Sequence, residues 1–320
     1  MGKIALLSAL AAFLLTAITL KLLIPLLKRL KMGQKILEIG PAWHIAKQGT
    51  PTMGGLAFLI CVPAVCLVFT LLDGAAPAML LTLSFALVNG LIGVADDLIK
   101  MKRKQNEGFS AFTKFLLQLI AASGYLVLCA YLGLLSTELY IPFWGQSIDI
   151  GRLYYPFALI MLTGFTNAVN LTDGLDGLCS SVTSAVCLFL AVMTLRDGEN
   201  ALSVLSLAVL GTCFGFLIFN FHPASVFMGD TGSLFLGGAV SGLALISGKN
   251  TVLLVVGGVY LLEAASVILQ VLYYKLTKKR LFLMAPFHHH LEKKGMSEVK
   301  ITLLMTAVTL ALAGISYLFI

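Results

Sequence analysis

The sequence contains little charge. Asp, Glu, Lys and Arg make up 12% of the 320 residues, whereas 59% of the residues are hydrophobic. A soluble domain carries about 25% charged residues, and exposing this much apolar surface to water is unfavourable. The composition therefore excludes an ordinary soluble globular protein and predicts a chain that lies in lipid.

Other familiar patterns are also missing. The six cysteines form no CxxC pair, which argues against a disulfide framework or a zinc site and predicts small buried hydrophobic residues. The apolar runs are long and lack period-2 alternation, which excludes a transmembrane β-barrel. The first run, Ile4 to Leu27, is too long for a signal-peptide core and lacks a small-residue cleavage site, so no cleavable signal is expected.

Long apolar runs dominate what is present. A spanning helix needs roughly 20 apolar residues, and we predict about ten such helices in an all-α, polytopic membrane bundle. The bundle is expected to form a single domain over residues 1–320. The predicted spans are 4–27, 52–72, 78–95, 113–135, 154–170, 177–195, 201–219, 232–247, 251–274 and 300–320.

The basic residues predict the orientation of the bundle. Segments 28–50, 96–114 and 275–300 fall on one side and contain 17 of the 22 Lys and Arg residues. The positive-inside rule makes that side cytoplasmic. Both termini then lie outside, which requires an even number of spans. This distribution also argues against nucleic acid as a partner, although the net charge is +7. The outer loop 136–153 mixes β-forming residues around Gly145-Gln146, which predicts a small outer hairpin near 138–151.

Acidic residues gather on the predicted cytoplasmic side. Carboxylates beside hydrocarbon are unfavourable unless they are paired or bind a metal ion. With lysines nearby they indicate a Mg²⁺-dependent phosphate site, because Mg²⁺ prefers carboxylate, phosphate and water oxygens. The residues concerned are Asp96, Asp97, Asp173, Asp176 and Asp230.

The first pair of carboxylates cannot share one role. Asp96 and Asp97 are adjacent, so on a helix their side chains point about 100° apart. One can touch a metal ion while the other acts as a base or supports the site. The simpler alternative is a solvated helix end in which they pair with Lys100 or Arg103.

The segment NAVNLTDGLDGL at 167–178 places Asn167, Asn170, Asp173 and Asp176 three residues apart. Each neighbouring pair could meet on a helical face. The glycines in DGLDG instead predict a broken turn, where backbone can approach a ligand closely. A polar turn between two helices is the alternative.

Asp230 follows a glycine and precedes an apolar run. This pattern is typical of a helix N-terminus, whose free N–H groups favour phosphate and carboxylate. A plain capping role for the aspartate is the alternative.

The remaining candidates lie in two loops. His288, His289 and His290 stand in the last cytoplasmic loop and can hydrogen-bond a pyrophosphate, or remain solvated. Lys47 precedes a glycine-rich entry to the second span. It can neutralise phosphate charge or extend to the interface as an ordinary membrane-end lysine.

Five motifs together resemble a known family. They are TPTMGG at 50–55, ADD at 95–97, NAVNLTDGLDGL at 167–178, FMGDTGSL at 227–234 and PFHHHLE at 286–292. ADD and the NxxNxxDGxDGL pattern are similar to those of the polyprenyl-phosphate N-acetylhexosamine-1-phosphate transferase superfamily. The first and last motifs resemble the phospho-N-acetylmuramoyl-pentapeptide-transferase family within it, from about residue 30 to the C-terminus.

The resemblance implies a reaction and its partners. UDP-N-acetylmuramoyl-pentapeptide would give its phospho-sugar to undecaprenyl phosphate with Mg²⁺, forming lipid I and UMP in peptidoglycan synthesis. The enzyme would lie in the bacterial inner membrane with its active site on the cytoplasmic face. A homodimer, and the choice between direct attack and a phospho-aspartyl intermediate, stay open.

The same resemblance suggests residue roles. Asp230 and Asp97 would hold Mg²⁺, and Asp96, Asp97, Asp230 and His289 would act in catalysis. Substrate binding would fall to Lys47, Thr52, Lys114, Asn167, Asn170, Asp173, Asp176, Phe227, His288 and His290. Phe227 is the expected stacking partner of uracil.

Two alternative functions compete with this transferase reaction. A sibling transferase loading N-acetylglucosamine-1-phosphate would share the acidic motifs but is disfavoured by the PFHHHLE loop. A secondary transporter would place its polar site near the bilayer midplane, usually in repeated halves. The polar residues here gather at one face, and no internal repeat is evident.

Overall fold

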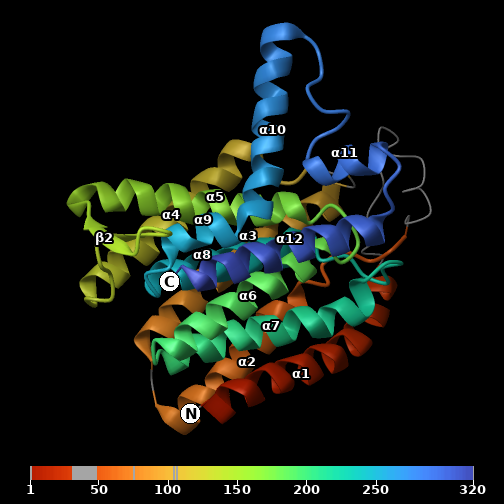
Figure 1. The fold of residues 1–320 in the computed structure, drawn as a ribbon. Coiled ribbons are helices and arrows are strands. Elements are labelled where there is room, and N and C mark those ends of the chain that lie inside the picture. The colour runs from red at the N-terminus through yellow and green to blue at the C-terminus, as the bar shows by residue number, and fades with distance from the viewer. Residues whose placement is uncertain (1, 31–48, 75, 104, 106, 320) are drawn as a thin grey trace.

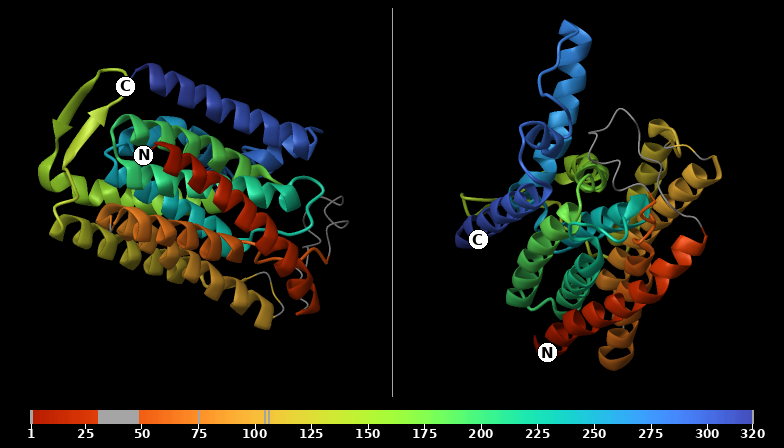
Figure 2. Two further views of the ribbon diagram at one scale, coloured as in Figure 1. Left: turned by 90° about the horizontal axis from the view of Figure 1, so that it is seen from below. Right: turned by 90° about the vertical axis from the view of Figure 1, so that its right-hand side faces the viewer.

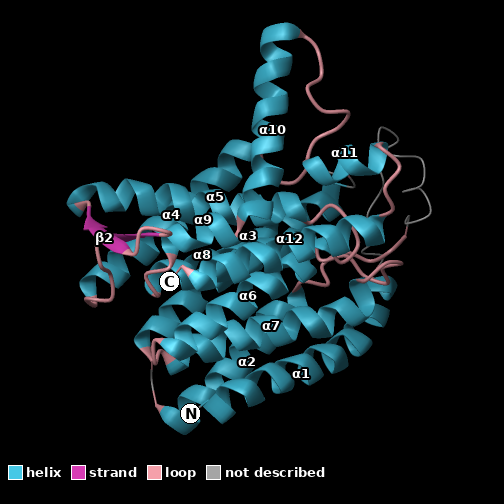
Figure 3. Ribbon diagram, in the orientation of Figure 1, coloured by secondary structure: helices cyan, strands magenta, loops and turns pink. Residues whose placement is uncertain are grey.

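The computed structural model describes residues 2–30, 49–74, 76–103, 105 and 107–319. Helices make up most of this part of the chain (Figure 3). They are α1 (Gly2–Arg29), α2 (Leu56–Asp73), α3 (Pro77–Arg103), α4 (Ala111–Tyr131), α5 (Tyr154–Thr172), α6 (Leu178–Arg196), α7 (Asn200–Asn220), α8 (Gly229–Ile246), α9 (Asn250–Val256), α10 (Gly258–Thr277), α11 (Phe287–Lys293) and α12 (Glu298–Leu318).

Nine of the ten predicted spans are confirmed by helices of the described residues. Within the described ranges, nine helices are long and apolar enough to cross a membrane, namely α1 to α4, α6 to α8, α10 and α12. The fifth predicted span is α5, whose second half carries the polar side chains of Thr163, Asn167 and Asn170. The chain is therefore a multi-pass, all-α membrane protein.

Two boundaries differ from the prediction in ways that shape the site. The second span begins at Leu56 rather than residue 52, because the backbone of 51–55 hydrogen-bonds to the segment 227–228. The third span continues to Arg103 rather than ending at residue 95. Asp96 and Asp97 therefore lie within the helix, two turns before its end.

The ninth predicted span, 251–274, is broken. It consists of the short helix α9 and the longer α10, which meet at Gly257-Gly258. A Cβ on Gly257 would lie 2.6 Å from a ring carbon of Phe165, so only glycine allows this close approach to α5. The later part of α10 projects from the bundle (Figures 1 and 2).

The predicted hairpin is confirmed. Strands β1 (Glu138–Ile141) and β2 (Gln146–Asp149) pair antiparallel, with Leu139 opposite Ile148. The two chain ends lie at the hairpin end of the bundle (Figure 2), and the Tyr140 hydroxyl donates to the Phe319 carbonyl at 2.9 Å. This placement agrees with the even number of spans that the charge pattern predicts.

Helices α6, α7 and α8 form the centre of the bundle, and about four-fifths of each is buried. Peripheral helices such as α1 and α10 are mostly exposed on apolar faces, as expected for lipid contact. Small residues let α8 pack tightly, since a Cβ on Gly237 would lie 2.6 Å from the Thr166 Cα of α5. The six cysteines are free and buried, as predicted.

Candidate functional site

The candidate site lies where α3 reaches the first turn of α8, at the end of the bundle away from the hairpin (Figure 1). A Cβ on Gly93 of α3 would lie 2.1 Å from the Asp230 carbonyl oxygen and 2.6 Å from the Thr231 amide nitrogen. Glycine is therefore required there for the two backbones to touch. This contact sets the positions of the α3 and α8 carboxylates relative to each other.

Asp97 of α3 caps α8. Its Oδ2 accepts hydrogen bonds from the Thr231 N–H at 2.9 Å and the Thr231 hydroxyl at 2.7 Å, and its Oδ1 accepts the Asp230 N–H at 3.3 Å. The helix's own N-cap residue, Met228, offers no side-chain bond. A carboxylate from another helix thus satisfies the free amides and interacts favourably with the helix dipole. Asp230 lies inside the first turn, so it is not the cap.

Asp96 and Asp230 share two lysine ammonium groups. Lys100 Nζ lies 2.7 Å from Asp230 Oδ2 and 2.8 Å from Asp96 Oδ2. Lys114 Nζ of α4 lies 2.6 Å from Asp230 Oδ2 and 3.5 Å from Asp96 Oδ2. Asp96 therefore contacts the lysines while Asp97 caps α8, although Lys100 Nζ also lies 3.7 Å from Asp97 Oδ1. The pairing with Lys100, expected for a plain helix end, is present as well.

The residues fit a divalent cation. Asp96, Asp97 and Asp230 each offer a carboxylate oxygen within 4.8 Å of the others. Asp96 is buried, and its Oδ2 pairs with the ammonium groups of Lys100 and Lys114. Three carboxylates whose oxygens lie this close together suit a hard cation with oxygen ligands.

Helix α5 adds an amide and a carboxyl group. Asn170 Nδ2 donates to Asp230 Oδ1 at 2.8 Å and to the Ser233 hydroxyl at 2.8 Å. Asp173 ends α5 in the predicted broken turn. Burial in that turn raises the pKa of Asp173 to about 8, and the nearby Asp230 and Asp97 carboxylates add to this effect.

Two loops pair beside the acidic cluster. Gly54 and Gly55 donate their N–H groups to the carbonyls of Phe227 and Met228, and Phe227 donates to Pro51. A Cβ on Gly229 would lie 3.0 Å from the Thr52 Oγ1, which places the Thr52 side chain at the entry to α8. The loop motifs at 50–55 and 227–234 therefore form one unit. Lys47 lies outside the described residues.

Asp176 turns away from Asp230. Its Oδ2 accepts from the Ala224 N–H at 3.1 Å and lies 3.0 Å from His222 Nδ1. Its own N–H donates to Glu298 at the start of α12, at 3.3 Å. Asp176 thus ties the turn to the loop after α7 and to the last helix. Asn167 likewise forms its side-chain hydrogen bond outside the acidic cluster, because its Nδ2 donates to Gln118 Oε1 of α4 at 2.6 Å.

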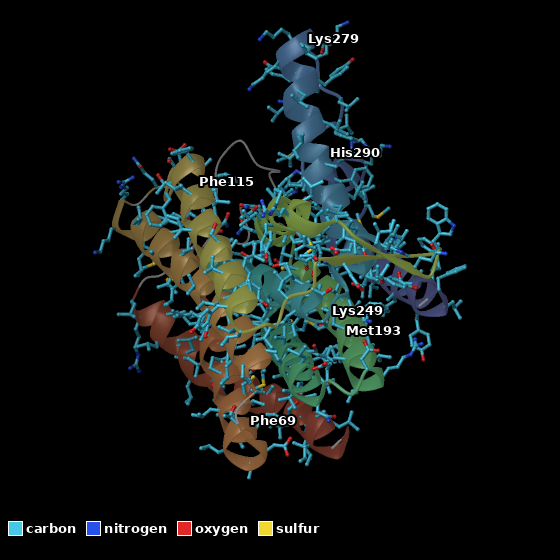
Figure 4. All side chains as sticks on the ribbon, turned by 90° about the vertical axis from the view of Figure 1, so that its left-hand side faces the viewer. Phe69, Phe115, Met193, Lys249, Lys279 and His290 are labelled. Atoms are coloured by element: carbon cyan, nitrogen blue, oxygen red, sulfur yellow. The ribbon has the colours of Figure 1, made fainter. Side chains whose placement is uncertain are left out.

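The three consecutive histidines have different surroundings. His288 is buried, and its Nδ1 lies 3.1 Å from Glu263 Oε2 of α10. His289 Nδ1 lies 2.6 Å from Glu292 Oε2. His290 accepts from the Leu283 N–H at 3.2 Å, and its ring contacts Phe282 and Phe287. Figure 4 shows His290 on the projecting part of the molecule, below Lys279.

His288 also touches the broken turn. A Cβ on Gly174 would lie 2.1 Å from His288 Nε2, so the ring is pressed against the turn's backbone. Glu263 of α10 orients this histidine, because its Oε2 contacts both the backbone N–H and the Nδ1 of His288. The loop that carries His288 is therefore packed against the turn that follows α5.

Sequence reasoning missed several residues of the site. Lys100 was read only as a partner for a helix end, although its spacing of three and four residues from Asp97 and Asp96 was a usable signal. Thr231 and Ser233 follow Asp230 in a recognised motif but carried no separate signal. His222 and Glu298 come from distant segments, so only the fold brings them to Asp176.

The fold and the site define a membrane-embedded helical protein with an acidic, lysine-lined site at one end of the bundle. Comparison with known proteins narrows this class. Glycosyl transferase family 4 matches residues 78–248, and signature 1 of phospho-N-acetylmuramoyl-pentapeptide-transferase matches residues 47–59.

Relatives match over nearly the full chain. The phospho-N-acetylmuramoyl-pentapeptide-transferase of Caldicellulosiruptor bescii is 43% identical over 306 residues, covering 95% of this chain and 93% of the relative. That of Heliobacterium modesticaldum is 46% identical over 296 residues, covering 92% and 91%. The chain belongs to the phospho-N-acetylmuramoyl-pentapeptide-transferase family, so it is a membrane-embedded transferase.

Proposed function

We propose that this protein transfers phospho-N-acetylmuramoyl-pentapeptide from its UDP donor to undecaprenyl phosphate, giving lipid I and UMP. The family membership and the names of its relatives support this reaction. The observation that carries it in the structure is the cluster of Asp96, Asp97 and Asp230 with two lysine ammonium groups. Phosphoryl transfer depends mainly on positioning and on neutralising phosphate charge, and this cluster supplies both signs of charge.

The proposed transfer exchanges one phosphorus–oxygen bond for another. An oxygen of the lipid phosphate bonds to the sugar-linked phosphorus of the donor, and the bond from that phosphorus to the bridging oxygen breaks. UMP leaves with the electron pair. Lys114 lies beside Asp230. Its ammonium can neutralise the negative charge that develops on the leaving phosphate.

The cluster is proposed to hold Mg²⁺. Asp230 is the principal ligand, and Asp96, whose Oδ2 pairs here with lysine ammonium groups, is the second. Asp97, the other expected ligand, lies at their side with both oxygens accepting N–H groups of α8. When bound, Mg²⁺ would neutralise the diphosphate and polarise its phosphorus–oxygen bonds.

The donor's nucleotide is proposed to occupy the side formed by α5 and the paired loops. Asn170 and Asp173 face the acidic cluster, and the half-exposed ring of Phe227 is available for stacking on uracil. Thr52, Lys47, His289 and His290 complete the predicted binding set. Asp176, Asn167 and His288 act in this proposal by holding the turn, α5 and the last loop in place.

We further propose that the site faces the cytoplasm across the bacterial inner membrane. The predicted spans put the basic segments 96–114 and 275–300 on the same side as the acidic motifs, and the positive-inside rule assigns that side to the cytoplasm. The lipid acceptor can then enter from the bilayer, while the charged donor arrives from water.

The deciding experiment measures UMP release by the purified protein from UDP-N-acetylmuramoyl-pentapeptide. Release is expected only with undecaprenyl phosphate present and is expected to stop when EDTA removes divalent ions. UDP-N-acetylglucosamine is the comparison donor for the sibling activity. Equal or faster UMP release from that donor would contradict the proposed specificity, and undiminished release in EDTA would contradict the metal.

A further inference from the structure

Lys100 occupies an unusual position in the acidic site. Its ammonium lies 2.7 Å from Asp230 Oδ2 and 2.8 Å from Asp96 Oδ2, the two oxygens proposed above as metal ligands. It also lies 3.7 Å from Asp97 Oδ1. One side chain therefore contacts all three carboxylates of the cluster.

A metal ion and this ammonium compete for the same oxygens. Mg²⁺ binds carboxylate oxygen at about 2.1 Å, so an ion on Asp230 Oδ2 would lie less than about 5 Å from Lys100 Nζ in its present position. Two cations that close in a buried site repel each other strongly. Joint occupancy is unfavourable unless one of them moves.

Lys100 is the group able to move. Its side chain is 27% exposed, whereas Asp96 is almost fully buried, and a lysine stem has several rotatable bonds. Lys114 lies as close to Asp230 Oδ2, at 2.6 Å, but its side chain is only 17% exposed and comes from α4, a separate helix. We therefore assign the displacement to Lys100, the more exposed of the two. The lysine on α3 can leave without disturbing that contact.

We propose that Lys100 is an internal counter-ion that holds the acidic cluster in the substrate-free protein and is displaced toward the donor's diphosphate when a divalent ion binds. This rests on the proposed metal site. With Lys100 and Lys114 present, the three carboxylates leave a formal charge of −1. A dication that displaces Lys100 brings the three carboxylates and Lys114 to neutrality, and the displaced ammonium adds a positive charge beside them that attracts the diphosphate, so the metal binds before or with the donor.

The proposal makes Lys100 a positioning residue that weakens metal binding in the absence of substrate. Its removal should therefore tighten divalent-ion binding, whereas a lysine that only binds substrate would leave the metal affinity unchanged. Lys102 provides a matched control, because it lies on the same helix and is exposed.

The test uses the purified full-length protein without substrates and Mn²⁺ as a probe of the oxygen-ligand site, with free Mn²⁺ measured by electron paramagnetic resonance. Lys100→Met should lower the Kd for Mn²⁺ by about tenfold, equivalent to about 1.4 kcal/mol. Lys100→Arg, which keeps the charge, and Lys102→Met should remain within about threefold of the parent protein.

A second measurement checks the variant's folded state. Without metal, Lys100→Met should unfold at a lower temperature than the parent protein, and Mg²⁺ should raise its Tm by more than it raises the parent's. Lys100→Gln serves for the same comparison if the methionine variant does not fold. An unchanged or weaker Mn²⁺ affinity in a folded variant overturns the counter-ion role while leaving the metal site standing. No Mn²⁺ binding in any of the proteins overturns the metal site itself, and the counter-ion role with it.

Discussion

Replacing Gly93 by alanine tests whether the contact between α3 and α8 sets the geometry of the site. The added methyl would lie 2.1 Å from the Asp230 carbonyl oxygen and 2.4 Å from its carbon. Both are backbone atoms of the first turn of α8, so no side chain can rotate away to make room. The start of α8 must move relative to α3.

The displacement can be estimated from the contact. Ordinary van der Waals contact begins near 3.4 Å, so the shortfall is about 1.3 Å. A shift of about 1 Å in a catalytic group can lower the rate by about 10²-fold. Overpacking destabilises a core by about 1–3 kcal/mol, partly offset by up to about 1 kcal/mol from alanine's higher helix propensity. Activity should therefore fall much more than stability.

UMP release and thermal unfolding measure the two quantities separately. Gly164→Ala on α5 is the matched control, because a Cβ there has no heavy atom within 4 Å. The control should retain the parent rate and a similar or higher Tm. If Gly93→Ala retained more than about a third of the parent rate, the close contact would not control the position of Asp230, and the reasoning would be wrong.

Three further predictions follow from the same geometry. Asp230→Asn should lower the UMP release rate by about 10²–10³-fold, the usual effect of losing electrostatic stabilisation. Circular dichroism should show that the variant is folded. A rate above a tenth of the parent's would contradict the role of Asp230. Gly174→Ala should reduce activity by at least about tenfold, because its Cβ would lie 2.1 Å from His288 Nε2, while Gly133→Ala, with open space and a positive φ in an outer turn, should change only stability. Asp173 has a pKa of about 8 in the folded protein against an ordinary value of 3.8. Between these pH values the folded state therefore binds more protons than the unfolded state. In EDTA the Tm should accordingly fall as the pH rises from 6 to 9. The Asp173→Asn variant should lose this pH dependence, and an equal slope in both proteins would rule out Asp173 as its source.

The motifs predicted which residues lie near one another. Each span reverses the side of the membrane, so every second loop lies on the same face. Asp96, Asp173 and Asp230 could be assigned to one end of the bundle by counting spans alone. The distances among them could not, since they depend on how closely helices far apart in the chain approach one another. The contact at Gly93 is such a case, because a glycine inside an apolar run shows no sign of what it touches.

The amino-acid sequence by itself determined the membrane class, most of the spans, the hairpin and the acidic motifs. These follow from local hydrophobic runs, from turn-forming residues and from charge near helix ends. Only the tertiary structure decided that Asp97 caps α8, that Lys100 lies between Asp96 and Asp230, and that Asp176 faces His222 and Glu298. Side-chain partners across helices depend on the rotation and packing of each helix about its axis. The hydrophobic pattern constrains that rotation weakly here, because lipid and neighbouring helices are both apolar.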